Sequence, residues 1–260
     1  MSKHLPKTVL AAAVAALLAV AAVPAAANHI PGSTVEGQPF NVDPTAIGEA
    51  QASFEAVVVN FNYEATVGQT AGGVFTESGL ATFSTFNNPF NTPLSASDTG
   101  LNLAGGYNLY ATFDATGTAA AAPGGGLNGV FNSFDISFFA DPDRNTTTLG
   151  TTPGGSMGDD VLVATGTLLN GGFHVFPGLA QGDFAVTVDA NSVGGFFSGI
   201  PILELTGVNT RITGVGPGEF TNGSIIGSGN VQAIPEPETY ALMLAGLGAL
   251  GFVARRRRRT

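Results

Sequence analysis

The sequence predicts an all-β fold, arranged as a single β-sandwich or jelly-roll-like domain. Three observations support this prediction. No window between residues 28 and 234 repeats apolar residues at the 3.6-residue period of a helix, several segments alternate apolar and polar residues, and clusters of Gly, Pro, Asn and Asp separate these segments. About eight to ten short strands with such spacing are typical of sandwiches and jelly rolls.

Three segments show the clearest alternation. They place on one face Val57, Val59, Phe61 and Tyr63; then Tyr107, Leu109, Ala111 and Phe113; then Val130, Phe134, Ile136 and Phe138. Because successive side chains of a strand point to opposite faces, we expect these residues in the core. Further strands are expected at 80–86, 161–168, 184–189, 202–208 and 224–233, with turns at 88–89, 123–126, 153–155, 170–172 and 194–195.

The composition excludes several kinds of site and partner. The chain has 260 residues, with no Cys and no Trp, so we expect no disulfide, no Cys-based metal site and no cysteine nucleophile. Of its 19 acidic residues all but Glu236 and Glu238 lie between residues 28 and 234, where the only basic residues are Arg144 and Arg211. Two positive against 17 negative charges give this region a formal charge of −15. Such a body repels a phosphate backbone, so no nucleic-acid partner is expected.

The first 27 residues are typical of a signal peptide. Lys3 and Lys7 precede an uncharged apolar run at 8–23, and Ala25-Ala26-Ala27 supplies the small residues that signal peptidase requires. A transmembrane anchor is the alternative, but the run is shorter than the roughly 20 residues that span a bilayer. We expect cleavage after about Ala27, followed by export of residues 28–233 as the folded domain.

The C-terminal segment 234–260 combines three features. Pro235, Glu236 and Pro237 favour an extended, exposed chain, and residues 240–254 form an uncharged stretch that suits an apolar helix of about 22 Å. Consecutive Arg residues then hold the terminus on the cytoplasmic side of the membrane. The residues expected to anchor the chain and stop its transfer are Tyr240, Leu242, Leu244, Leu247, Leu250, Phe252, Arg255, Arg256, Arg257, Arg258 and Arg259.

This order of features resembles the PEP-CTERM sorting signal of Gram-negative bacteria that make exopolysaccharide. The resemblance implies that exosortase, a membrane protease, recognises Pro235, Glu236 and Pro237 after transient anchoring of residues 240–254 in the inner membrane. It also implies release to the cell surface or the extracellular matrix. Two alternatives stay open: a tail anchor that is retained, and a helix-dimerisation face formed by Gly246, Gly248 and Gly251.

The predicted domain resembles the flocculation-associated members of the same class. The resemblance rests on residues 106–113 with 116–118, on 141–143 before 146–150, and on 159–164. It implies a role in the cohesion of cells with exopolysaccharide or other matrix components, and it carries over no catalytic residue. A secreted carbohydrate-binding module is the alternative, although the lack of Trp weakens it.

One acidic segment is a candidate calcium site. Asp141, Asp143 and Asn145 present oxygen atoms at alternate positions, as many calcium loops do, but Thr146 and Thr152 stand where an EF-hand has Gly and Glu. A looser Ca²⁺ site could also use Asp159 and Asp160. The alternative is an Asp- and Asn-rich turn whose side chains cap their own backbone. No cofactor other than Ca²⁺ is expected.

No pattern in the sequence predicts an enzyme. Residues 154–158 match the Gly-x-Ser-x-Gly string of hydrolases, but Pro153 and two glycines precede Ser156 where a strand should lie. The expected mature chain offers only His29 and His174 as imidazole bases. A glycosidase needs two carboxyl groups at a set separation, which the sequence does not show. We therefore expect a protein that acts by binding.

Overall fold

The structure is a computed structural model, and it describes residues 38–69, 73–122, 126–176, 179–189, 195–199, 202–212, 215–216, 219–220, 223–234 and Leu247. The predicted signal peptide and Pro-Glu-Pro motif lie outside the described residues, as does the predicted C-terminal helix apart from Leu247. In the parts of the chain that are described, no helix combines the length and the apolar character needed to cross a membrane.

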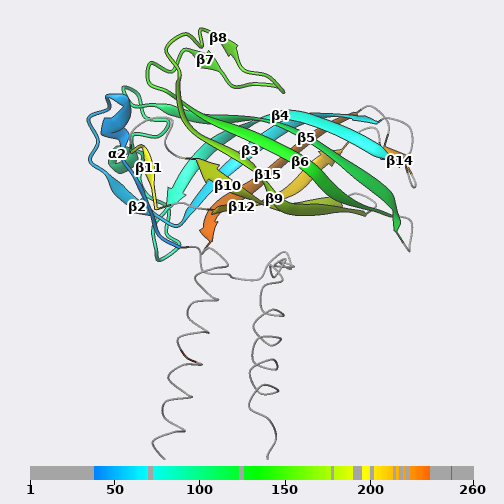
Figure 1. Cartoon of the computed structure of the whole chain (residues 1–260). Helices are drawn as coiled ribbons and strands as arrows, with labels where there is room; N and C mark the ends of the chain where they lie inside the picture. The colour runs from blue at the N-terminus through cyan, green and yellow to red at the C-terminus, as the bar shows by residue number, and fades with distance from the viewer. Residues whose placement is uncertain are drawn as a thin grey trace, which may run out of the picture. The chain divides into compact units, whose positions relative to one another are not determined.

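Eight long antiparallel strands close into a barrel (Figure 1). Around the barrel they are β10 (Leu179–Asp189), β12 (Ile202–Ile212), β15 (Gly223–Ile234), β3 (Val58–Gln69), β4 (Val74–Asn87), β5 (Asn108–Ala122), β6 (Gly126–Asp141) and β9 (Val161–Phe176), which returns to β10. Each strand is paired on both sides, so the main-chain groups that an open sheet leaves free at its edges are bonded in this barrel.

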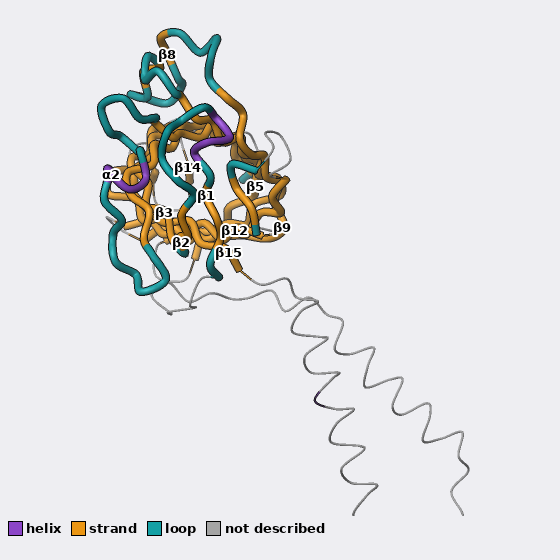
Figure 2. The backbone as a smooth tube through the Cα atoms, turned by 90° about the vertical axis from the view of Figure 1, so that its left-hand side faces the viewer, coloured by secondary structure: helices purple, strands orange, loops and turns teal. Residues whose placement is uncertain are grey.

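Short elements accompany the barrel. β1 (Phe40–Val42), β2 (Phe54–Ala56) and β11 (Phe197–Ser198) form a small sheet, next to a 3-10 helix (Pro44–Ile47) and α2 (Ala96–Thr99). Figure 1 shows β2, β11 and α2 gathered at one end of the barrel, the end that faces the viewer in Figure 2. β7 (Thr146–Thr147) pairs with β8 (Gly154–Gly155) in the loop that joins β6 to β9, and β13 (Val215–Gly216) pairs with β14 (Glu219–Phe220).

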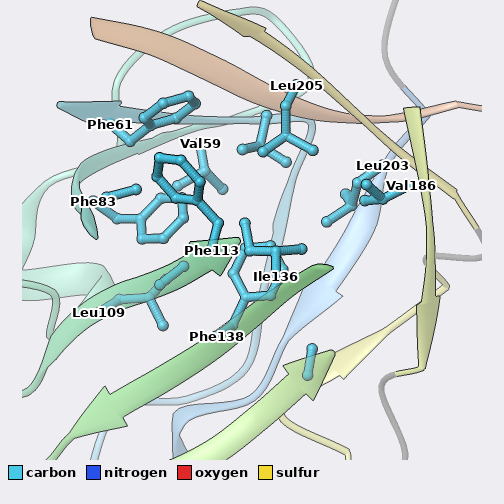
Figure 3. Packing of buried hydrophobic residues seen from close by; sticks show 14 of the residues in the cluster. Val59, Phe61, Phe83, Leu109, Phe113, Ile136, Phe138, Val186, Leu203 and Leu205 are labelled. Atoms are coloured by element: carbon cyan, nitrogen blue, oxygen red, sulfur yellow. The ribbon is translucent and has the colours of Figure 1, made fainter. Parts of the chain in front are cut away.

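Apolar side chains fill the barrel interior (Figure 3). Phe61 and Phe138 each pack against Phe83, with ring centroids 5.8 Å apart in both pairs. The small sheet joins the same core, since Phe197 in β11 contacts Phe138 in β6 edge-on at 6.4 Å. Burial of these aromatic rings stabilises the fold, because it removes a large apolar area from water.

Glycine and aromatic residues face each other across neighbouring strands. Gly227 in β15 lies opposite Tyr63 in β3, and Gly129 in β6 lies opposite Phe173 in β9. A Cβ atom at Gly227 would come within 2.5 Å of the Tyr63 ring, and one at Gly129 within 1.9 Å of the Phe173 ring. The rings therefore cover bare backbone, an arrangement that lets large side chains fit inside a narrow, strongly curved sheet.

The all-β class predicted from the sequence is confirmed, and the sandwich or jelly-roll arrangement is corrected to a closed barrel. Each of the strands expected at 57–63, 80–86, 107–113, 130–138, 161–168, 184–189, 202–208 and 224–233 corresponds to a longer barrel strand. The sheet does not divide into two layers, because β15 pairs with β3 and β9 pairs with both β6 and β10.

Two local expectations are also corrected. Val130 is 56% exposed and not in the core, because the register between β5 and β6 shifts at Thr116/Gly117 and an extra residue changes the face to which Val130 points. The expected turn at 170–172 is part of β9, where these residues pair with β10. Asn and Gly in this segment mark an irregular stretch of strand and not its end.

Candidate functional site

Outward-facing polar side chains form continuous rows across the barrel strands. One row runs in register through Thr66, Ser78, Asp114, Asp135, Thr167 and Thr187, from β3 through β4, β5, β6 and β9 to β10. A second row contains Thr76, Thr116 and Ser133. We call these nine residues the hydroxyl face. Its hydroxyl groups pair across strands, with oxygen atoms 2.6 Å apart for Thr116 and Ser133 and 3.0 Å apart for Thr167 and Thr187.

A hollow of about 700 Å³ lies over the β3–β6 part of this face. Among its lining residues are Thr66, Thr76, Ser78, Asp114, Thr116, Ser133 and Asp135, and none of the lining residues that the structure describes is aromatic. Hydroxyl groups both donate and accept hydrogen bonds, whereas ionised carboxylates only accept them. The described lining therefore suits a ligand that is rich in hydroxyl groups and that is held by hydrogen bonds.

Asp114 and Asp135 give the hydroxyl face a negative centre. They lie directly opposite each other in β5 and β6, and both are exposed. Like charges opposite each other on paired strands destabilise a sheet. Within the described residues Arg144 is directed elsewhere, since its guanidinium group donates hydrogen bonds to Asn108 and to the carbonyl of Leu103. The face thus favours neutral or cationic ligands over anionic ones.

A second polar cluster holds the β6–β9 loop, residues 142–160, against the barrel. Asp141 is fully buried, and its carboxylate accepts hydrogen bonds from the backbone N–H groups of Arg144 at 2.7 Å and Thr146 at 3.1 Å. The Tyr110 hydroxyl donates to Asp160 Oδ2 at 2.5 Å, and Thr146 Oγ1 lies 2.9 Å from the same oxygen. The cluster therefore ties both ends of the loop to β5.

Burial and charge set the protonation of this cluster. Burial raises the pKa of Asp141, and the nearby carboxylate of Asp160 raises it further, while the two backbone hydrogen bonds oppose the rise. Burial also raises the pKa of Tyr110, together with its hydrogen bond to Asp160. The Tyr110 ring stacks on Phe139 with centroids 5.3 Å apart, so an aromatic pair lies beside the polar groups.

The structure separates the five candidate calcium ligands into different roles. Asp141 and Asp160 meet around Thr146, whereas Asp143 accepts hydrogen bonds from the backbone and side chain of Asn145. Asp159 is exposed. Among the described residues, no three His, Cys, Asp or Glu side chains lie close enough to hold a metal ion together. This geometry favours the Asp- and Asn-rich turn, and calcium binding stays a prediction.

Glu77 is a titratable group that the sequence analysis missed. It is half-buried in β4, where it lies between the inward-facing residues Phe75 and Gly79, and burial raises the pKa of its carboxyl group to about 7. The alternation of Phe75, Gly79, Ala81 and Phe83 assigns Glu77 to the same face of the strand. This pattern is hard to recognise in the sequence because Gly79 has no side chain. A carboxyl group in this position disfavours ionisation because it has lost hydration.

The sequence comparisons identify the C-terminal segment. Residues 233–259 match the PEP-CTERM protein-sorting motif. Neither a curated protein nor a solved structure matches the chain. The motif indicates a protein that is exported, transiently anchored in the membrane and processed by exosortase.

Proposed function

We propose that the barrel promotes the cohesion of cells with exopolysaccharide at the cell surface or in the extracellular matrix. The observation that supports this proposal is the hydroxyl face, which presents hydrogen-bonding groups in register across six neighbouring strands. The sorting motif supports the proposal further, because it indicates that the protein is exported.

The spacing of the face suits a polymer. Neighbouring strands are about 4.8 Å apart, so the two rows offer a regular array of donors and acceptors to successive hydroxyl groups of a polysaccharide. Each hydrogen bond to such a ligand contributes little on its own because it replaces one to water. Many weak contacts along one chain together produce useful retention. The proposal therefore expects binding that grows with polymer length.

A retention assay tests the proposal with the processed protein from its host. The variant Ser78→Ala/Thr116→Ala/Ser133→Ala removes three hydroxyl groups from the hydroxyl face and leaves its charge unchanged, and we expect its binding to the host's own exopolysaccharide to fall about tenfold. A matched variant, Glu55→Gln/Ser228→Ala, changes exposed groups outside the face and should bind as the wild type does. Equal retention of the two variants would contradict the assignment to this face.

A carbohydrate-binding module with a defined cleft is the second candidate, favoured by the hollow on the face. A glycan array distinguishes the two. A module gives strong signals with particular short oligosaccharides, whereas the cohesion protein gives weak retention that depends on polymer length.

The intact mass of the protein in its host's extracellular matrix tests the release that the cohesion role requires. We expect a mass that lacks residues 1–27 and everything after about Pro237. A mass that retains residues 240–260 would instead indicate a permanent tail anchor, and cohesion would then operate at the cell envelope.

A further inference from the structure

The last barrel strand ends immediately before the Pro-Glu-Pro motif. β15 pairs with β12 as far as Ile234, which lies opposite Ile202, and Pro235 is the next residue. The residues that match the sorting motif start at Ala233, inside β15. Ala233 and Ile234 therefore belong both to the folded barrel and to the matched sorting segment.

These shared residues are held by specific contacts. Ala233 is fully buried, and its carbonyl accepts a hydrogen bond of 2.8 Å from the backbone N–H of Gln38. The preceding residue, Gln232, pairs with Val58 in β3 and donates a side-chain hydrogen bond of 2.6 Å to Glu204 in β12. The end of β15 is thus tied to both neighbouring strands and to the segment before β1.

A protease needs several extended, unpaired residues on both sides of the bond that it breaks. Only residues 235–239 separate β15 from the apolar stretch that begins at Tyr240, a reach of about 17 Å when fully extended. We propose that the folded barrel restrains its own processing, because β15 holds the residues that exosortase must grip ahead of Pro235. Processing then waits for local opening of the end of β15.

This inference rests on processing by exosortase and adds a regulatory step to it. Cleavage of one peptide bond by water leaves a carboxylate on the barrel and an amine on the anchor, and the barrel affects access to that bond and not its chemistry. A chain whose barrel has not yet closed exposes residues 231–234 and is cut quickly. A chain that has already folded is cut at the rate at which β15 opens.

The test inserts Gly-Ser-Gly-Ser-Gly-Ser between Ile234 and Pro235 of the full chain in its host. Pulse-chase labelling follows conversion of the anchored form to the released form, and we expect conversion about tenfold faster than in the wild type, because the linker supplies unpaired residues. The same insertion after Gly150 is the control. Gly150 lies in the β6–β9 loop with open space around it, so conversion should keep the wild-type rate.

A second variant tests the same inference without changing the length of the chain. Gln38→Pro removes the N–H group that bonds the Ala233 carbonyl, so the end of β15 should open more often and conversion should be about threefold faster. Equal rates for the wild type, the linker variant and Gln38→Pro would overturn the inference. If none of the chains, including the wild type, were shortened, the assignment to exosortase processing would itself be wrong.

Discussion

Tyr63 in β3 lies directly opposite Gly227 in β15, and its ring occupies the space that a larger residue at 227 would need. The pair belongs to the contact between β3 and β15, which links the N-terminal and C-terminal strands of the barrel. Its packing therefore supports closure of the sheet as well as filling of the core.

Gly227→Ala should destabilise the barrel. The new Cβ would come within 2.5 Å of Tyr63 Cε1, and overpacking of this kind costs about 1–3 kcal/mol. Gly158→Ala is the matched control, because no atom lies within 4 Å of the Cβ position there. Urea denaturation measures both free energies of unfolding, and equal midpoints would show that Tyr63 moves aside without cost.

Glu77 should make the barrel less stable as the pH rises. The pKa of its carboxyl group is about 7 in the folded chain against 4.5 as its ordinary value, so the folded state binds the proton more tightly. The contribution of Glu77 to stability is therefore fully present below about pH 4.5 and is lost as the pH rises through about 7.

The variant Glu77→Gln tests this titration. It keeps the shape but cannot ionise, so it should be about 1–2 kcal/mol more stable than the wild type at about pH 8, and of similar stability at about pH 4. Glu55→Gln makes the same change at an exposed position and should show no such difference. Parallel unfolding curves for Glu77→Gln and wild type at both pH values would contradict the inward placement of Glu77.

Tyr110→Phe should loosen the β6–β9 loop. The change removes the hydroxyl group that donates to Asp160, and a hydrogen bond to a charged group contributes about 1.5–3 kcal/mol. Amide hydrogen exchange in residues 142–160 should accelerate, while exchange in β3 and β15 stays slow. Tyr107→Phe removes a buried hydroxyl group with no hydrogen-bond partner within the described structure, and it should leave loop exchange unchanged.

Cohesion with an anionic polymer should depend on divalent cations. The region 28–234 carries a formal charge of −15, so a polymer with carboxylate groups is repelled unless a cation such as Ca²⁺ bridges the two. A chelator should abolish aggregation with an anionic exopolysaccharide and should leave aggregation with a neutral one intact. If the chelator left aggregation unchanged in both mixtures, bridging by cations would be excluded.

The strands were predictable from the sequence because alternation is a local property. Val59, Phe61 and Tyr63 face the core as expected, and so do Leu109, Ala111 and Phe113. Closure of the sheet was not predictable, because alternation does not say which distant strands pair. The pairing of β3 with β15 joins segments more than 150 residues apart in the chain, and only the folded structure reveals it.

The candidate sites also combine features that the sequence predicts with features that only the fold reveals. The alternation that puts Leu109 and Ala111 in the core leaves Tyr110 on the opposite face of the strand, but it does not show that the β6–β9 loop covers that face and buries the ring. It drew attention to Asp141 and Asp160, yet their shared partner Thr146 lies between them in the loop and emerges only in three dimensions. The sorting segment could be recognised without the fold, because its three features are consecutive in the sequence.

The hydrogen bond between Gln38 and Ala233 brings the two ends of the barrel chain to one place. When the anchored protein holds a polymer on the hydroxyl face in flowing water, tension between the anchor and the face enters the barrel beside this bond. It next reaches β15, which is hydrogen-bonded along both sides to β12 and β3. The mechanical resistance of the barrel is therefore concentrated in β15, the strand that leads to the Pro-Glu-Pro segment. Pulling would open the end of β15 before it disturbed the hydroxyl face.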